Sequence, residues 1–103
     1  MISKSLLTGL APMHPGELLR EDVLPATGLT KTEIARKLGV SRQTLHDLVA
    51  ERQPVTVAMA LRLGKLFGNS AEFWLNLQRN YDLRILEREM ADELAAIPTL
   101  DAA

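Results

Sequence analysis

Residues 29–52, LTKTEIARKLGVSRQTLHDLVAER, predict two short helices joined by a tight turn. Thr30 precedes the first helical run and Glu33 follows three residues later, which is the pattern of a capping box. Gly39 ends this run, because glycine enters the left-handed region without a Cβ penalty. Ser41 is then a candidate N-cap for a second run whose apolar residues recur at helical spacing.

The predicted crossing of the two helices has the residues that a helix-turn-helix unit needs. Ala35 is small where the helices cross, and Gly39 permits the turn between them. The apolar wedge is supplied by Ile34, Val40, Leu45 and Leu48. An ordinary amphipathic hairpin with a solvated polar face is the alternative, but the combination of small residue, glycine and wedge favours the helix-turn-helix.

The outward face of the second helix carries side chains that can read DNA bases. This face bears Arg42, Gln43, His46 and Asp47, with Ser41 and Thr44 beside them. Arg can contact guanine bidentately and Gln can do so with adenine, in a major groove wide enough for a helix. A carboxylate at Asp47 must instead accept from a cytosine amino group or pair with Arg42 or His46.

The charge of the chain is unevenly distributed. The formal net charge is −1, but residues 31–71 carry seven basic and three acidic groups, whereas residues 72–103 carry three basic and seven acidic groups. Charges separated by more than about 8–10 Å are largely screened in cell-like salt. We therefore expect the basic middle to attract phosphates locally, with salt-sensitive affinity.

Composition and motifs exclude several classes of protein. The chain has 103 residues and no cysteine, so we expect a single domain without disulfides or thiolate chemistry. No glycine-rich phosphate loop, His-x-x-x-His pair or activated serine is present, and we expect neither an enzyme, a cofactor nor a metal site. His14 is expected to be a cap or a surface residue.

No apolar run has the length of a membrane span and no signal peptide is recognisable, which favours a cytoplasmic protein, nucleoid-associated when bound to DNA.

Helices are also predicted on both sides of the central unit. A helix beginning at Pro15 is expected to be stopped by Pro25 and Gly28. Thr56 is expected to cap a helix over residues 57–67, ended by Gly68, with Gly64 at a close-packing point. The core residues expected from that helix are Val57, Ala60, Leu61, Leu63 and Phe67.

Two residues near the end of the reading helix, Arg52 and Thr56, are candidate phosphate contacts. Such contacts position a protein on DNA without specifying sequence. Solvent exposure without any DNA contact is the alternative for both.

The last long helical segment begins after Asn69 or Ser70, either of which is a candidate cap. It contains an aromatic and apolar stripe made of Phe73, Trp74, Leu77 and Tyr81. Aromatic residues are enriched at interface centres, and a small DNA reader needs a two-fold partner to contact half-sites about 34 Å apart. We therefore predict a homodimer surface here, although some of these residues are also expected to close the core.

The acidic residues beyond Leu83 have two interpretations. Glu87, Glu89, Asp92 and Glu93 form a solvated face in the simpler one. In the other they attract a basic protein partner. The expected organisation is a loose arm over residues 1–12, a DNA-binding domain over residues 13–83, and a helical extension and tail over residues 84–103.

With these segments in place, the chain resembles the HigA-type antitoxins (VapI-like), a branch of the phage-repressor-like helix-turn-helix superfamily. The matching segments are MHPGELLREDVL, GLTKTEIARKLGVSRQTLHDLVAER, VAMALRLGKLFG and NSAEFWLNLQRNYDL, within residues 12–83. The resemblance implies an all-α, five-helix repressor-like bundle that dimerises on a palindromic operator in its own promoter. It also implies a HigB-like toxin, an mRNA-cleaving enzyme that the antitoxin neutralises.

The resemblance further implies roles for individual positions. The family's groove-facing positions match Ser41, Arg42, Gln43, His46 and Asp47. Positions that meet backbone phosphates match Thr30, Lys31 and Thr44. Two alternatives to an antitoxin stay open: a stand-alone regulator of the same fold, and a protein-interaction module that has lost DNA binding.

Overall fold

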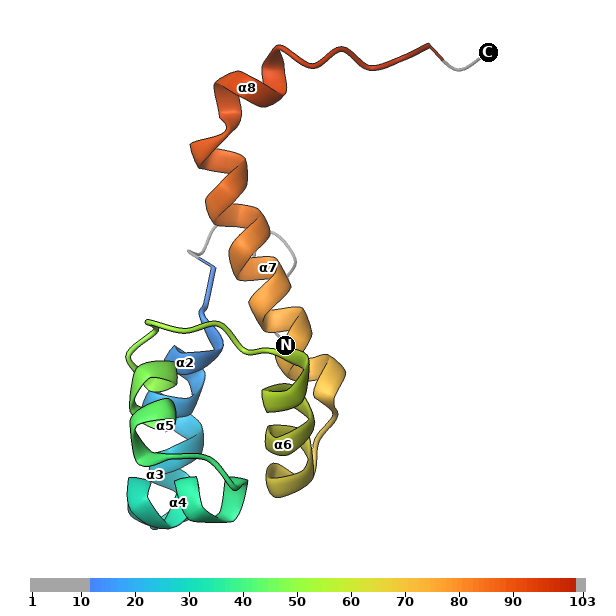
Figure 1. Ribbon diagram of the computed structural model, residues 1–103. Coiled ribbons are helices and arrows are strands. Elements are labelled where there is room, and N and C mark those ends of the chain that lie inside the picture. Colours follow the sequence, from blue (N-terminus) through green and yellow to red (C-terminus); the bar gives the residue numbers. More distant parts are fainter. Residues whose placement is uncertain (1–11, 102–103) are drawn as a thin grey trace.

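The computed structural model describes residues 12–101, and within that range every regular element is a helix (Figure 1). The elements are α2 (Pro15–Leu18), η1 (Leu19–Val23), α3 (Leu24–Thr27), α4 (Lys31–Leu38), α5 (Arg42–Val49), α6 (Val57–Phe67), α7 (Ala71–Glu89) and α8 (Ala91–Ala95). Because α2, η1 and α3 form one continuous helix, the predicted five-helix all-α core with a helical extension is confirmed. The predicted N-terminal arm lies outside the described residues, apart from Pro12.

The prediction that Pro25 stops the first helix is wrong, because the helix continues to Thr27. The helix widens to a π-turn over η1, where the Leu24 amide bonds to the Leu19 carbonyl, five residues back. Pro25 has no amide hydrogen and its ring would crowd the carbonyl of a regular preceding turn. The wider turn makes room for that ring, so the helix ends only at Gly28, which has a φ of 70°.

The predicted caps and glycine stops are confirmed. The hydroxyls of Thr30, Ser41, Thr56 and Ser70 each accept a hydrogen bond from the amide three residues on. Gly39 and Gly68 end α4 and α6 with φ values of 74° and 73°. Of the two candidates at the start of α7, Ser70 is the cap, and Asn69 instead accepts from the Trp74 indole Nε1 at 2.9 Å.

The core lies where the first helix, α4, α5, α6 and α7 meet. Its largest fully buried side chains include Trp74, Leu19, Ile34, Leu45, Leu48 and Leu63. Trp74 is 0% exposed within a single chain, so its predicted place on a dimer surface is wrong. Val57 and Leu61 are 63% and 60% exposed, so their predicted place in the core is also wrong. They share a face of α6 that no other helix covers.

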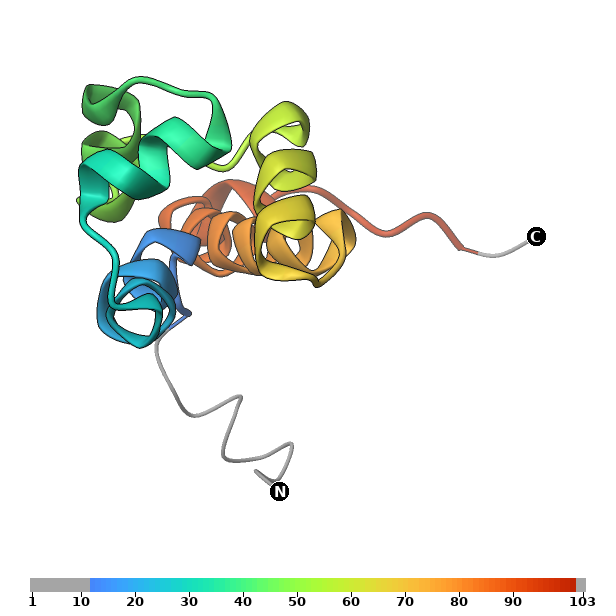
Figure 2. The same ribbon diagram turned by 90° about the horizontal axis from the view of Figure 1, so that it is seen from below.

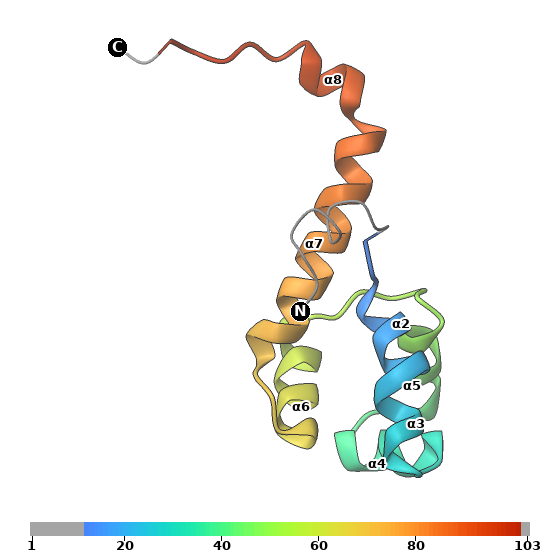
Figure 3. The same cartoon turned by 180° about the vertical axis from the view of Figure 1, so that it is seen from behind.

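The helices form three groups around this core, as Figure 2 shows: α2–α3, α4–α5 and α6–α7. The second half of α7 extends past the other helices and leads into α8 (Figure 1, Figure 3). The helix runs unbroken through residues 83 and 84, where the sequence places a boundary. None of the helices described is long and apolar enough to cross a bilayer.

The start of the first helix touches the backbone of α5. A Cβ built on Gly16 would overlap the carbonyl oxygen of Leu48, so no larger residue fits without moving a helix. Beside it, His14 is buried and its Nδ1 accepts from the Gly16 amide at 2.8 Å, while its ring meets the edge of Tyr81 at 5.0 Å between centroids. The predicted capping role of His14 is therefore confirmed, and its surface alternative is wrong.

We predict that Gly16→Ala destabilises the fold by about 3 kcal/mol, because the new methyl group overpacks a backbone contact. It should also shift the amide NMR resonances of α5. Gly28→Ala is the matched control: nothing lies within 4 Å of its built Cβ, so it should cost only the left-handed conformation, about 1–2 kcal/mol. Equal losses in urea unfolding, with α5 resonances unchanged, would contradict the prediction.

Candidate nucleic-acid interface

The turn between α4 and α5 is fixed by its own backbone and by α6. The Val40 amide donates to the Ala35 carbonyl at 3.0 Å and the Gly39 amide to the Arg36 carbonyl at 3.1 Å. Arg62 of α6 donates to the Leu38 carbonyl at 2.7 Å, where the negative end of the α4 dipole favours a cation. Arg62 is one of the seven basic residues of the segment 31–71, and its guanidinium donates a hydrogen bond within the chain.

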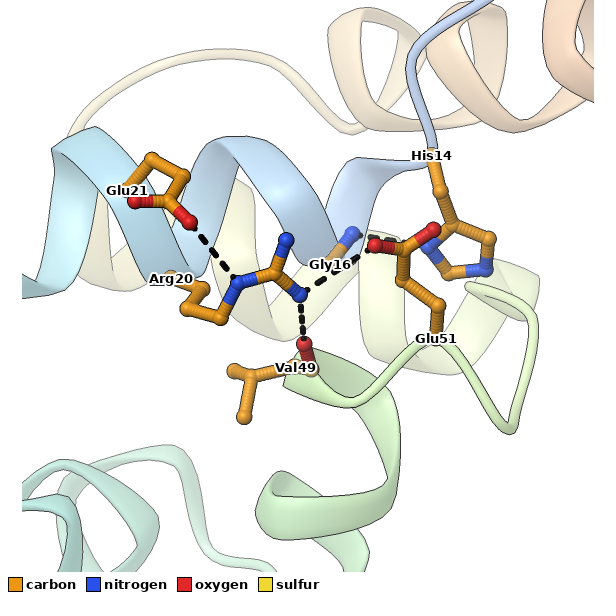
Figure 4. Close-up of polar contacts among 6 residues, drawn as sticks. All are labelled: His14, Gly16, Arg20, Glu21, Val49 and Glu51. Atoms are coloured by element: carbon orange, nitrogen blue, oxygen red, sulfur yellow. Dashed lines mark hydrogen bonds and ion pairs between the residues drawn. The ribbon is translucent and has the colours of Figure 1, made fainter.

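The end of α5 is held by Arg20 of the first helix (Figure 4). Its Nη1 donates to the Val49 carbonyl at 2.7 Å and to Glu51 Oε2 at 3.2 Å, and its Nε donates to Glu21 at 3.0 Å. The carbonyls of the three preceding residues accept amides from residues 50–52, so Arg20 satisfies the last unpaired carbonyl of the helix. Glu51, which accepts from Arg20, has a left-handed backbone conformation with a φ of 63°.

Sequence reasoning missed Arg20 because its partner Val49 lies 29 residues away. An Arg on a predicted amphipathic helix carries no signal that distinguishes a carbonyl partner from solvent. Only the packing of the two helices brings the guanidinium to the end of α5.

Four of the predicted DNA-contacting residues meet at one hollow. Lys31, at the start of α4, and Arg42, Gln43 and His46 of α5 line a surface hollow of about 460 Å³. All four residues are exposed. Neither Lys31 nor Arg42 has an ion-pair partner within residues 12–101, so their charges are available to phosphates or base acceptors.

The predicted hydroxyl contacts also serve as caps. Ser41 Oγ accepts from the Thr44 amide at 3.0 Å and lies 2.7 Å from Thr44 Oγ1. Thr30 accepts from the Glu33 amide at 3.1 Å. Thr56 caps α6 and has no hydrogen bond, in the part of the chain described, to the residues that line the hollow. A DNA contact by any of these residues stays a prediction.

Asp47 has other partners than Arg42 or His46, which were the intramolecular partners expected from the sequence. Its Oδ1 accepts from Arg52 Nη2 at 3.0 Å, from Arg52 Nε at 3.3 Å and from Gln43 Nε2 at 2.9 Å. Asp47 therefore fixes the direction of the Gln43 amide and compensates the charge of Arg52. These contacts hold the pKa of Asp47 below its usual value, with the Arg52 hydrogen bond as the largest cause.

The remaining predicted dimer residues do not line the hollow lined by Lys31 and Arg42. Phe73 is exposed and, with residues of the first helix, lines a hollow of about 550 Å³. Leu77 and Tyr81 are partly buried. A dimer contact by these three residues stays a prediction.

The helix-turn-helix family matches residues 19–74, which include α4, α5 and α6. The chain belongs to the helix-turn-helix family. Virulence-associated protein I of Dichelobacter nodosus is 40% identical over 84% of this chain and 80% of the relative. Antitoxin HigA-1 of Vibrio cholerae is 36% identical over 70% of this chain and 68% of the relative.

A solved structure extends the likeness to the whole helical body. The Pseudomonas aeruginosa antitoxin HigA, solved with the higBA promoter, superposes with a TM-score of 0.82 at 37% identity. The superposition covers 87% of this chain and 99% of that one. Within the helix-turn-helix family the chain therefore lies in the HigA branch, and the resemblance found in the sequence is confirmed.

We predict that Arg52→Ala raises the pKa of Asp47 toward its ordinary value, because it removes the strongest cause of the shift. The folded pKa lies below the unfolded one, so the contact stabilises the fold above about pH 4 and is lost as pH falls through the folded value. Carbon NMR of the Asp47 carboxyl across the acid range measures this. Arg42→Ala is the control and should leave the titration unchanged; an equal shift in both variants would refute the assignment.

Proposed function

We propose that this protein is a sequence-specific DNA-binding repressor that acts as the antitoxin of a type II toxin–antitoxin pair. The observation that carries the proposal is the hollow lined by Lys31, Arg42, Gln43 and His46 on the exposed face of a helix-turn-helix. It combines two cations that have no ion-pair partner among residues 12–101 with an amide and an imidazole, which suit phosphate and base-edge acceptors. The Pseudomonas HigA structure, which was solved with a promoter, supports a DNA-binding function for the chain.

In the proposed complex α5 enters the major groove. Arg42 and Gln43 read bases, with Ser41 and His46 beside them, and Asp47 acts through Gln43. Because one amide hydrogen of Gln43 is already given to Asp47, its oxygen and remaining hydrogen are oriented before DNA arrives. That orientation favours the bidentate contact that Gln makes with adenine.

The phosphate contacts come from the edges of the same surface. Lys31 adds a free charge at the start of α4, and Thr30, Thr44 and Thr56 offer hydroxyls near helix N-termini, where the dipole favours anions. Arg52 contributes less than a free arginine, because Asp47 already accepts from it at 3.0 Å. These contacts fix register on the duplex, while the reading helix supplies sequence preference.

The repression mechanism we propose is steric. A homodimer places two α5 helices in successive major grooves of a palindromic operator, about 34 Å apart. The bound dimer then excludes polymerase from its own promoter, so the operon is autoregulated. The site of action is the cytoplasm, on the nucleoid.

The toxin partner is inferred from the HigA branch. We propose a HigB-like, mRNA-cleaving toxin encoded next to this gene, which the chain binds and neutralises. Co-expression with the neighbouring gene product tests this separately from DNA binding. Growth arrest by the neighbour alone, relieved by this chain, is the expected result; a harmless neighbour would favour a stand-alone regulator.

We predict that the protein binds DNA from upstream of its own gene about 10³-fold or more tightly than scrambled DNA, the usual margin for specific sites. Titration against salt should give a steep loss of affinity, because bound phosphates release counterions. Equal affinity for both DNAs at every salt concentration would mean that the fold is used for another partner.

We predict different losses from the two kinds of contact. Arg42→Ala and Gln43→Ala should each cost about 1–3 kcal/mol on the operator and relax preference at one base pair. Lys31→Ala should weaken all sequences alike and lower the salt slope by about one unit. Lys65→Ala is a control of equal charge outside the hollow. Equal losses on operator and scrambled DNA for Gln43→Ala would remove it from the base readers.

A further inference from the structure

His14 is a buried titratable group that the proposed DNA contacts do not use. It is 3% exposed and stands directly before the first turn of the first helix. Its Nδ1 accepts from the Gly16 amide at 2.8 Å (Figure 4). A ring nitrogen that accepts a hydrogen bond carries no proton, so this contact requires the neutral imidazole. The ring hydrogen is then on Nε2, and the Gln53 backbone carbonyl accepts it.

The imidazole joins three segments that are distant in sequence. Gly16 begins the first helix, Gln53 lies in the loop after α5, and Tyr81 belongs to α7. The imidazole meets the Tyr81 ring edge-on, at 5.0 Å between centroids. Gln53 directly follows Arg52, which donates to Asp47 of the reading helix. One neutral side chain therefore contacts both the helix that packs on α5 and the loop that leaves α5.

A proton on Nδ1 would turn this acceptor into a donor that faces another donor. The Gly16 amide would then be buried without a partner, which is costly. Gly16 also lies so close to the Leu48 carbonyl of α5 that a methyl group does not fit between them. A shift of the first turn therefore changes its packing on the reading helix.

The charged groups around the ring act in opposite directions. Glu51 and Asp82 favour the protonated ring, whereas Arg20 disfavours it. Arg20 also donates to Glu51 at 3.2 Å, so that carboxylate is already compensated. Burial is the largest cause and lowers the pKa of His14 below its ordinary value. Mild acid therefore favours any arrangement in which the His14 ring is released from its partners.

We propose that His14 is a positioning residue for the reading helix. In its neutral form it holds the first helix, the loop after α5 and α7 in one arrangement. Protonation releases these segments, and the protein loses operator affinity although His14 makes no DNA contact. The part of the proposal that concerns operator DNA rests on the repressor proposed above, whereas the part that concerns the position of α5 does not.

His14→Asn separates capping from titration. Asparagine is a strong N-cap whose oxygen accepts from the same amide, and it does not titrate. Because the folded pKa of His14 lies below the unfolded one, its stabilisation is complete above about pH 6.5 and is lost as pH falls. Relative to His14→Asn, the unfolding equilibrium constant of the wild type should rise about tenfold between about pH 7.5 and about pH 5.5 in urea titrations.

His46→Asn is the matched control for this measurement. His46 is the other histidine of the chain and is exposed, so its replacement should leave the acid loss of stability intact. Amide hydrogen exchange then locates the loss. Protection of the α5 amides, corrected for intrinsic exchange, should fall with pH in the wild type and in His46→Asn but not in His14→Asn.

Operator binding distinguishes a positioning residue from a DNA contact. His14→Ala lacks the acceptor and should bind the operator about tenfold more weakly at neutral pH, whereas His14→Asn should restore most of the affinity. The salt slope should be equal in all three proteins, since His14 neutralises no phosphate. In mild acid the wild type should lose operator affinity relative to His14→Asn; both proteins contain His46, so its protonation cancels.

The proposal is overturned if nitrogen NMR places the hydrogen of the neutral ring on Nδ1, or if the wild type and His14→Asn unfold with the same pH dependence. If His14→Ala does not fold, this pH comparison decides alone. Acid loss of α5 protection in a protein that never distinguishes operator from scrambled DNA would sink the proposed function alone. Specific operator binding with the same pH dependence in the wild type and His14→Asn would sink this proposal alone.

Discussion

The close approach of α2 to the end of α5 is the contact on which the exposed polar surface depends. A helix of eight residues is too short to be stable alone, so α5 must be held by packing while one face stays free. Gly16 lets the first helix touch the Leu48 carbonyl, and Arg20 donates to the Val49 carbonyl beside it. Because both contacts are made to backbone atoms, they fix the axis of α5 without occupying its polar side chains.

The charged residues divide into those used inside the chain and those left free for a partner. Arg20 and Arg62 stabilise helix ends by donating to carbonyls, and Arg52 is compensated by Asp47. Lys31 and Arg42 keep their charges and share one hollow. The charges of Lys31 and Arg42 therefore lie beside the side chains that can read bases, whereas the charge of Arg52 is compensated within the chain.

The first half of α7 packs into the core, whereas its second half is exposed. Trp74 is sealed into the core, and Gln78 accepts from the Val55 amide at 2.8 Å, which ties the first half of the helix to the body. The second half extends past the other helices and leaves Leu83 and Leu86 exposed.

The sequence by itself determined most of the helix ends and which helix carries the exposed polar face. A cap such as Ser41 or a left-handed glycine such as Gly39 acts on atoms within a few residues, so its effect is visible in the local pattern. Tertiary structure decided what depends on distant neighbours. The neighbours of α7 bury Trp74, which periodicity alone had assigned to a surface as well as to the core.

The candidate site was likewise predictable from the sequence only in part. Periodicity predicted which side chains of α5 point outward, because a helix repeats its faces at fixed spacing. It did not predict that Asp47 would accept from Arg52 rather than from Arg42 or His46, nor that Arg20 would reach the end of α5. Those pairings depend on where the chain turns after α5 and on how two helices distant in sequence cross, and only the packed core determines either.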